Sequence, residues 1–401
     1  MFPPPASHPH RCPCLRWPLP LCCHQCHLQP WCPAPLNACP SQTFAVCALV
    51  TLLWVICGYS MAFMPGSEWL GRFDAVLLEG VVYDKRAGLV SVHHLATSVP
   101  ESVFVMFQLT FAIITPALIA GAFAERMRFA AMLAFMALWS LLVYAPVAHW
   151  VWEPTGWLAR MGMLDFAGGT VVHVNAGIAG LVCAWMLGRR LGFGQEPLMP
   201  SNLGYTMMGA SLLWVGWMGF NGGSAGAADG RAGMALLVTQ IGAASATLAW
   251  MAAEWVVRGT PTLLGLCSGA VAGLVAITPA SGFVEPKSAM LIGLLAGVGC
   301  YWGATGLKRL LGADDSLDVF GVHGVGGTIG ALMTGVLASP TVGGVSGSLQ
   351  SQAAGVVATL VYSGVMTALI LWVVDQVVGL RVSRQQEIDG LDLSLHGERV
   401  E

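Results

Sequence analysis

The chain has 401 residues, of which 56% are hydrophobic and only 10% are charged. A water-soluble domain of this length cannot bury so large an apolar fraction, so the composition excludes an ordinary soluble protein and predicts a polytopic membrane protein. The formal net charge of −3 is too small to indicate a nucleic-acid partner.

Residues 1–41 differ in composition from the rest of the chain. The first 40 residues hold half of the 22 prolines and seven of the 12 cysteines, and they contain no apolar run long enough to cross a bilayer. Four neighbouring residues, Cys23, His24, Cys26 and His27, are candidate ligands of a zinc knuckle. They lack the spaced ligand pairs that such sites usually have. We interpret 1–41 as an anomalous segment, placed by an upstream frameshift or a misplaced start where a first membrane helix belongs.

Ten apolar windows follow, each about 20 residues long, which is the length of a helix that crosses the hydrocarbon core. They are 43–64, 102–124, 129–152, 169–188, 202–221, 234–257, 261–279, 288–307, 319–338 and 354–378. The windows are continuously apolar rather than alternating, which favours helices over a β-barrel. We therefore predict an all-α transmembrane domain over 42–379, followed by a tail over 380–401.

Basic residues predict the orientation of these helices. If the tail is cytoplasmic, the cytoplasmic loops collect more arginine and lysine than the opposite loops, as the positive-inside rule requires. The cytoplasmic group is Arg126, Arg128, Arg189, Arg190, Arg258, Lys308, Arg309, Arg381 and Arg384. The loop over residues 65–100 is then expected outside a cell membrane.

A motif occurs twice, 150 positions apart, and places a lone histidine in each of two apolar windows. The first copy is Asp165, His173, Gly177 and Gly180, and the second is Asp315, His323, Gly327 and Gly330. The second histidine lies in the fifth window counted from residue 202, whereas the first lies in the fourth counted from residue 43. Repeats of five helices have opposite topology, so we predict two inverted five-helix halves, with one helix missing from the first and window 354–378 outside the repeat.

The histidines admit a structural and a functional interpretation. A single buried imidazole is usually bonded to a nearby carbonyl oxygen, but two at matched positions favour a polar strip along a substrate path. Metal ligation is the weaker interpretation, because no third ligand lies within a turn of either His173 or His323. Asp165 and Asp315 precede them by eight residues and are expected to cap helices, although Asp165 could also attract a cation.

Aromatic residues gather where three windows reach the outer side. Phe107, Gln108 and Phe111 lie in the second window, Trp152 ends the third, and Trp217, Phe220 and Ser224 lie at the end of the fifth. Most tryptophans of a membrane protein belong to an interfacial belt. A cluster drawn from three helix ends favours instead a vestibule that selects a small cation by cation–π attraction.

Four segments resemble the ammonium transporter (Amt/Mep/Rh) family, in its bacterial form. They are residues 121–129 (GAFAERMRF), 164–177 (LDFAGGTVVHVNAG), 216–224 (GWMGFNGGS) and 318–325 (DVFGVHGV). The resemblance covers the chain from about residue 42 to the tail. It implies an eleven-helix fold, a homotrimer with one pore in each subunit, and a transporter rather than an enzyme, with no cofactor and no metal.

The resemblance also implies roles for single residues. Trp152, Phe111 and Ser224 match the family's external ammonium site, with Asp165 near the entrance, and Phe111 and Phe220 match the stacked phenyl gate beneath it. His173 and His323 match the twin histidines of the pore, while Trp217, Phe107 and Gln108 line the vestibule and upper pore. Ammonium is then expected to lose its proton at the gate and to cross as ammonia. One departure is Glu153 and Pro154, where the family is usually rich in glycine.

Residues 387–398 resemble the family's cytosolic regulatory tail, which in bacteria accompanies control by a PII-type signalling protein. Three other functions stay open at this point. One is an ammonium sensor of the same fold, although such chains usually append a signalling domain. The second is a proton-coupled carrier of another solute, which leaves the aromatic cluster unexplained. The third is a transport-defective product that lacks its first helix.

Overall fold

The computed structural model of the protein describes residues 38–195 and 202–397. The predicted anomalous segment 1–41 therefore lies outside the described residues, except that residues 38–41 form the first turn of a helix. The four candidate zinc ligands lie outside the described residues altogether.

The described chain is almost entirely helical. Its first half contains α2 (Ala38–Leu53), η2 (Trp54–Gly58), α3 (Tyr59–Phe63), η3 (Val76–Leu78), β1 (Tyr83–Asp84), β2 (Leu89–Val90), α4 (Glu101–Ile119), η4 (Ala120–Ala122), α5 (Phe129–Trp139), η5 (Ser140–Tyr144), α6 (Ala145–Trp152), α7 (Trp157–Arg160), η6 (Gly169–Val174) and α8 (Asn175–Leu187). Its second half contains α9 (Leu203–Gly223), α10 (Gly230–Arg258), α11 (Leu263–Ile277), α12 (Pro286–Trp302), η7 (Gly303–Leu307), α13 (Lys308–Leu311), η8 (Phe320–Gly324), α14 (Val325–Leu337) and α15 (Pro340–Gly343). The chain ends with α16 (Leu349–Val377), α17 (Arg384–Asp389) and η9 (Asp392–His396).

The ten predicted windows all fall on helices. In the described part of the chain, eight helices are long and apolar enough to cross a membrane. The other two windows fall on α9, with 21 residues, and on α11, with 15. A helix of 15 residues is about 22 Å long, shorter than a hydrocarbon core of about 30 Å. Since every residue from Gly269 to Ile277 is buried, α11 lies inside the bundle rather than against lipid.

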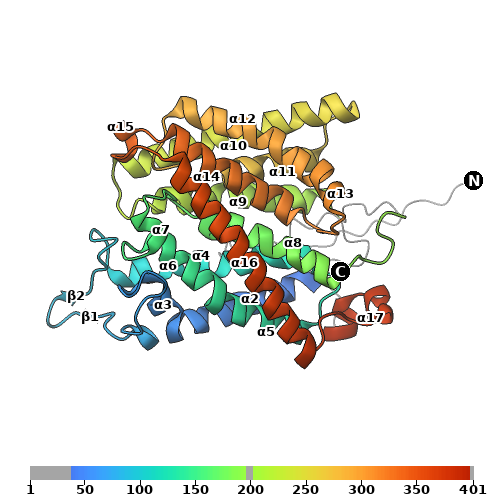
Figure 1. The fold of residues 1–401 in the computed structure, drawn as a ribbon, viewed down its shortest axis with the longest axis horizontal. Helices are drawn as coiled ribbons and strands as arrows, with labels where there is room; N and C mark the ends of the chain where they lie inside the picture. The colour runs from blue at the N-terminus through green and yellow to red at the C-terminus, as the bar shows by residue number, and fades with distance from the viewer. Residues whose placement is uncertain (1–37, 196–201, 398–401) are drawn as a thin grey trace, which may run out of the picture.

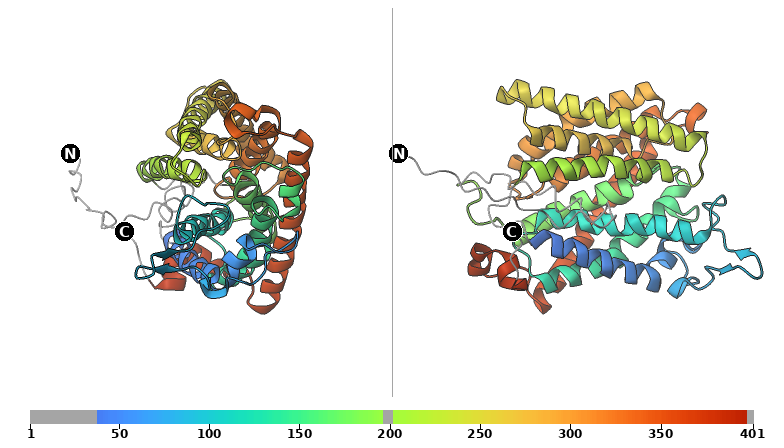
Figure 2. Two further views of the ribbon diagram at one scale, coloured as in Figure 1. Left: turned by 90° about the vertical axis from the view of Figure 1, so that its left-hand side faces the viewer. Right: turned by 180° about the vertical axis from the view of Figure 1, so that it is seen from behind.

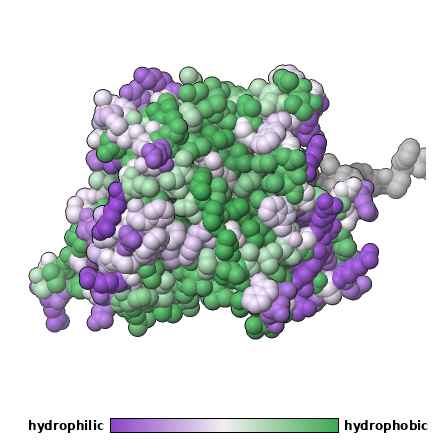
Figure 3. Space-filling view, in the orientation of Figure 1, coloured by the Kyte–Doolittle hydropathy of each residue, from purple (hydrophilic) through white to green (hydrophobic). Residues whose placement is uncertain are grey.

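The long helices lie side by side, and their two ends differ (Figures 1 and 2). The β1–β2 hairpin and α7 lie at one end, here called the hairpin end, whereas α13 and α17 lie at the other, here called the tail end. Hydrophobic side chains cover the middle of the surface between two polar ends (Figure 3). This arrangement confirms the predicted all-α polytopic membrane protein.

Helix starts follow from local sequence. Asn202, Asp229, Thr262 and Ser348 each stand just before a helix, and each side chain accepts a hydrogen bond from a backbone N–H of the first turn. These N-caps satisfy donors that have no partner within the helix. Short polar residues between apolar windows thus fix where α9, α10, α11 and α16 begin.

The two motif copies build matching structures that run in opposite directions. Each histidine lies on a π-helical turn, η6 or η8, that leads into a longer helix, α8 or α14. A residue with left-handed backbone precedes each turn, Gly168 with φ of 103° and Asp318 with φ of 56°. The two helices start beside each other, and from there α8 runs toward the tail end and α14 toward the hairpin end (Figure 1). In the described residues α9 has no counterpart in the first half.

Matched glycines let the two halves approach closely. A Cβ on Gly177 would lie 2.4 Å from the backbone of Gly324, and one on Gly327 would lie 2.7 Å from the carbonyl oxygen of Gly169. Gly177 and Gly327 occupy the same place in the two motif copies. Each therefore admits the other half's histidine turn, and no larger residue fits there.

The last long helix, α16, joins both halves. The amide nitrogen of the buried Gln352 side chain donates to the carbonyl oxygens of Leu164, at 2.8 Å, and Ala331, at 2.9 Å. Its amide oxygen accepts from the backbone N–H of Leu164 at 2.7 Å. Ser363 further along α16 donates to the carbonyl oxygen of Asn175. One polar residue thus connects the segment before η6 with α14.

The glycine contact predicts a large effect of one added methyl group. Gly177→Ala should lower the free energy of unfolding by about 2–3 kcal/mol or more, because the methyl group meets backbone that cannot move aside. Gly219→Ala is the matched control, since a Cβ there has open space around it and alanine favours helix. Thermal unfolding of the detergent-solubilised protein measures both. Equal unfolding temperatures for the two variants would contradict the close approach.

Candidate functional site

The two histidines of the repeated motif meet between the halves. The Nδ1 atoms of His173 and His323 are 3.3 Å apart, and the ring centroids lie 5.3 Å apart with 26° between the planes. Both side chains are buried. In such a contact one Nδ1 carries the proton and the other accepts it. With both rings neutral, the two Nε2 atoms then differ in kind, since one is a donor and the other an acceptor.

Further aromatic rings continue from His173 toward the hairpin end. The indole of Trp217 stacks on His173, with centroids 5.3 Å apart and 16° between the planes, and the phenyl ring of Phe220 follows at 6.1 Å. Trp217 and Phe220 both belong to α9 and are one helical turn apart, so their rings lie on the same face. The second half thus supplies the rings that cover the first half's histidine.

Phe111 of α4 connects this group with Trp152 at the end of α6. The Phe111 ring lies 4.3 Å from that of Phe220 and 5.5 Å from the indole of Trp152, and Phe107 lies beside it at 5.0 Å. Phe111 and Phe220 are buried, whereas Trp152 is half-buried. A continuous row of rings, here called the ring row, therefore runs from partly exposed Trp152 to buried His323.

The two indoles of the ring row are held by hydrogen bonds at their nitrogens. Trp152 Nε1 donates to the carbonyl oxygen of Asp165 at 2.8 Å, and Trp217 Nε1 donates to Thr278 Oγ1, also at 2.8 Å. Thr278 in turn donates to the carbonyl oxygen of Leu274. A buried indole N–H normally needs such a partner, and the bond fixes the plane of the ring.

Asp165 caps a helix start, as its place in the sequence predicts. Its two carboxylate oxygens accept hydrogen bonds from four consecutive backbone N–H groups, those of Gly168, Gly169, Thr170 and Val171, at 2.7–3.1 Å. Asp315 accepts from the backbone N–H of Phe320 at 2.8 Å. Burial raises the pKa of Asp315 to about 6, although the charge of Lys308 opposes that shift. The carboxylate of Asp165 thus supports the turn that carries His173.

Ser224 and Gln108 contribute polar atoms near the hairpin end of the ring row. Ser224 is half-buried, and its hydroxyl donates to the carbonyl oxygen of Phe220 at 2.8 Å, so the lone pairs of its oxygen are left to accept. The side-chain oxygen of Gln108 is buried and accepts no hydrogen bond from the described residues. Both atoms are acceptors, the kind of group that an N–H donor requires.

Other residues at the hairpin end escaped the sequence analysis. Phe63 stacks on Trp152, with centroids 6.2 Å apart and 15° between the planes. His94 lies in the loop before α4, and its Nε2 is 2.9 Å from a carboxylate oxygen of Glu153. The adjacent histidines at 93 and 94 and the departure at Glu153 were visible in the sequence, but nothing in their spacing joined positions 59 residues apart.

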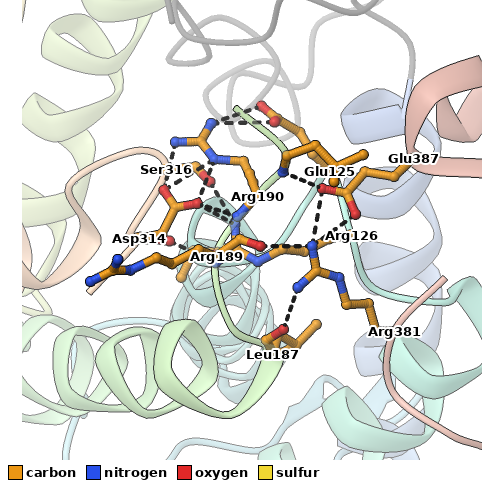
Figure 4. Close-up of polar contacts among 11 residues, drawn as sticks. Glu125, Arg126, Leu187, Arg189, Arg190, Asp314, Ser316, Arg381 and Glu387 are labelled. Carbon is orange, nitrogen blue, oxygen red and sulfur yellow. Dashed lines mark hydrogen bonds and ion pairs between the residues drawn. The ribbon is translucent and has the colours of Figure 1, made fainter. Parts of the chain in front are cut away.

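A network of charged residues joins both halves at the tail end (Figure 4). Asp314, before η8, is 2.7 Å from Arg190 after α8, and its carbonyl oxygen accepts from Arg126 after α4. Arg381 binds Glu387 of α17 and the carbonyl oxygens of Leu187 and Arg189. The tail is thereby attached to the segment that follows α8.

Charge within this network favours ionised Asp314. Burial alone would raise the pKa of Asp314, but hydrogen bonds from Arg190 and the charges of Arg190 and Arg126 outweigh burial and hold that pKa below its usual range. Burial would also lower the pKa of Arg190, which Asp314 and Glu125 instead raise. The network is therefore a buried ionic cluster whose members depend on one another.

The fold and the ring row together define a multi-pass membrane protein with a polar site between two opposed halves. The chain belongs to the ammonium transporter family. The sequence pattern of that family, described as the Ammonium Transporter Family, matches residues 36–401. The resemblance of the four motifs is thus confirmed over nearly the whole chain.

Individual relatives agree with this assignment. An ammonium transporter of Aquifex aeolicus is 49% identical over 371 residues, covering 90% of this chain and 84% of that protein. An ammonium transporter of Bacillus subtilis is 44% identical over 368 residues, covering 90% of this chain and 89% of that protein. The crystal structure of Saccharomyces cerevisiae Mep2 is similar with a TM-score of 0.83 and 35% identity, covering 91% of this chain and 84% of the Mep2 chain.

The four hydrogen bonds of Asp165 predict a strong effect of Asp165→Asn. The amide nitrogen of asparagine would face two N–H donors that now share one oxygen, so we expect a loss of about 2–4 kcal/mol of folding stability and loss of ammonium uptake. Asp229→Asn is the matched control, because that cap receives one backbone N–H, from Ala232, and asparagine caps equally well. Thermal unfolding and uptake by proteoliposomes test both, and a neutral Asp165→Asn would refute the role.

The lowered pKa of Asp314 predicts a stability contribution that depends on pH. Because its pKa is lower in the folded than in the unfolded state, the contribution is present above about pH 4 and is lost as the pH falls through the folded value. Asp314→Asn should therefore cost about 3 kcal/mol at pH 7. The difference from wild type should shrink as the pH falls below about 4. Unfolding followed by tryptophan fluorescence measures this, with the exposed Asp389→Asn as control; a difference independent of pH would argue against ionised Asp314.

Proposed function

We propose that this chain carries ammonium across a membrane through a pore formed by the ring row. The observation that carries the proposal is the unbroken series of ring contacts from Trp152, through Phe111 and Phe220, to His173 and His323. The relatives of 44–49% identity are ammonium transporters, which favours transport over sensing.

Recruitment is assigned to the hairpin end of the row. The faces of Trp152 and Phe111 attract a cation, and Ser224 accepts a hydrogen bond from it, with Gln108 and Trp217 lining the path farther in. A desolvated cation–π contact contributes about 2 kcal/mol. The idealised cost of moving a small cation into a medium of low dielectric is of order 20 kcal/mol, so these rings recruit the cation without carrying it onward. Asp165 contributes indirectly, since its oxygens already accept four backbone bonds.

The phenyl rings of Phe111 and Phe220 form the gate at which ammonium loses its proton. Ammonia then continues past the two imidazoles, which offer it one acceptor and one donor. The proton follows a separate relay through His173 and His323, whose Nδ1 atoms are within hydrogen-bond distance. A pore without both imidazoles would have no path for the proton.

The hairpin end is the outer end and the tail end is cytoplasmic, in a cell membrane of the bacterial inner-membrane type. The arginines of the tail-end network support this orientation by the positive-inside rule. We also propose that the chain forms a homotrimer, as the family resemblance implies. We further propose that the tail, attached through Arg381 and Glu387, is regulatory and is the contact region for a PII-type protein.

The relay predicts that charge movement needs both imidazoles. Replacing them together, His173→Leu with His323→Leu, should abolish the current that ammonium induces in proteoliposomes on a solid-supported membrane. His396→Leu, in the tail, should leave that current unchanged. An unaltered current in the double variant would refute the relay, and no current or uptake with the wild-type chain would refute transport itself.

A further inference from the structure

The loop over residues 91–99 contacts both halves at the hairpin end. On the first half, His93 Nε2 lies 3.1 Å from the carbonyl oxygen of Phe63, and its ring stacks on Phe104 at 4.3 Å. On the second half, the Ser98 hydroxyl donates to the carbonyl oxygen of Gly226. A Cβ on Gly226 would lie 3.5 Å from that of Ala96, so the loop packs directly on this residue.

These contacts are adjacent in sequence to the two sides of the proposed ammonium site. Gly226 comes two residues after Ser224, and Glu153 comes directly after Trp152. The loop reaches Glu153 through His94, whose Nε2 is 2.9 Å from Glu153 Oε2. One loop of nine residues therefore connects the Trp152 side of the site with the Ser224 side.

Glu153 is buried to an unusual degree for a carboxylate at the end of a membrane helix. Its side chain is only 2% exposed, while that of His94 is 41% exposed. Burying a carboxylate without partners costs several kcal/mol. His94 is one partner of the Glu153 carboxylate, and the Thr155 hydroxyl, which donates to it at 3.4 Å, is the other. These two contacts stabilise the buried position of the Glu153 side chain. The backbone at Glu153 is extended, which ends α6 at Trp152. The contact with His94 thus holds Glu153, the residue at which α6 ends, in place.

The two histidines of the loop have different tasks. Burial and the neighbouring His94 lower the pKa of His93 to about 4, so His93 stays neutral and packs against Phe104. His94 is the more exposed residue and reaches across to Glu153. His93 therefore anchors the loop on α3 and α4, and His94 connects it to the end of α6.

We propose that His94 and Glu153 are positioning residues for ammonium recognition. The His94–Glu153 contact holds the Trp152 side of the site, and the contact of Ser98 with Gly226 holds the Ser224 side. The loop thereby fixes the separation of Trp152 and Ser224, and that separation determines which small cation fits between them. Loosening the loop weakens binding of ammonium more than binding of the bulkier methylammonium. The inference rests on the proposed function and assigns a specificity role to the Glu153 position.

The test compares variants of the full chain in proteoliposomes, using uptake of radiolabelled methylammonium and its inhibition by ammonium. Glu153→Ala and His94→Ala should each raise the half-inhibiting ammonium concentration roughly tenfold, the equivalent of one hydrogen bond. The KM for methylammonium should change less and the maximal rate should stay within about twofold. The double variant should be no worse than either single variant, because the two residues act as one pair.

Two further variants separate position from charge and from general damage. Glu153→Gln keeps an acceptor for His94 and should behave like the wild type, whereas a defect equal to that of Glu153→Ala would show that charge rather than position matters and would overturn the inference. Glu79→Ala, an exposed acidic residue between α3 and α4, should have no effect. If Glu153→Ala does not fold, His94→Ala at the exposed partner carries the test.

The outcomes also separate this inference from the proposed function. Wild-type uptake that ammonium does not inhibit would refute ammonium transport. Wild-type uptake that ammonium inhibits, with an unchanged ratio of ammonium to methylammonium affinity in Glu153→Ala and His94→Ala, would refute the positioning role alone.

Discussion

The contact between the two histidine turns is the constraint on which the rest of the structure depends. Two imidazoles lie buried in an apolar bundle with their Nδ1 atoms 3.3 Å apart. Such polar groups are costly in a membrane protein unless they meet a partner. They meet because Gly177 and Gly327 let the backbones of the two halves approach more closely than any side chain permits. The ring row, the caps at Asp165 and Asp315, and the inner helix α11 all surround this contact.

The sequence allowed the main contacts of the ring row to be predicted, because repetition carried the information. The matched motifs predicted that His173 and His323 share one site, and the aromatic helix ends predicted the cluster around Phe111. The capping role of Asp165 followed from its position before a glycine pair. These predictions concern residues whose contacts depend on their own helix or on the matching helix of the other half.

Other features depend on contacts that no local pattern encodes. The π-helical turns of both histidines lie where one half packs on the other, and the end of α11 from Gly269 to Ile277 is buried inside the bundle. The pair of His94 and Glu153 and the network around Asp314 join residues 59 and 124 positions apart. A charged residue in a loop has many partners available to it in sequence, and only the fold selects one.

The last helix has a consequence for how the molecule moves. Gln352 of α16 bonds to backbone on both halves, and the glycine contact between the halves leaves no space for sliding. Rocking of one half past the other, the usual motion of inverted-repeat carriers, would break these bonds where no water replaces them. Turning the phenyl rings of Phe111 and Phe220 breaks no hydrogen bond. We therefore expect the two halves to stay fixed relative to one another in the described residues while side chains of the ring row move.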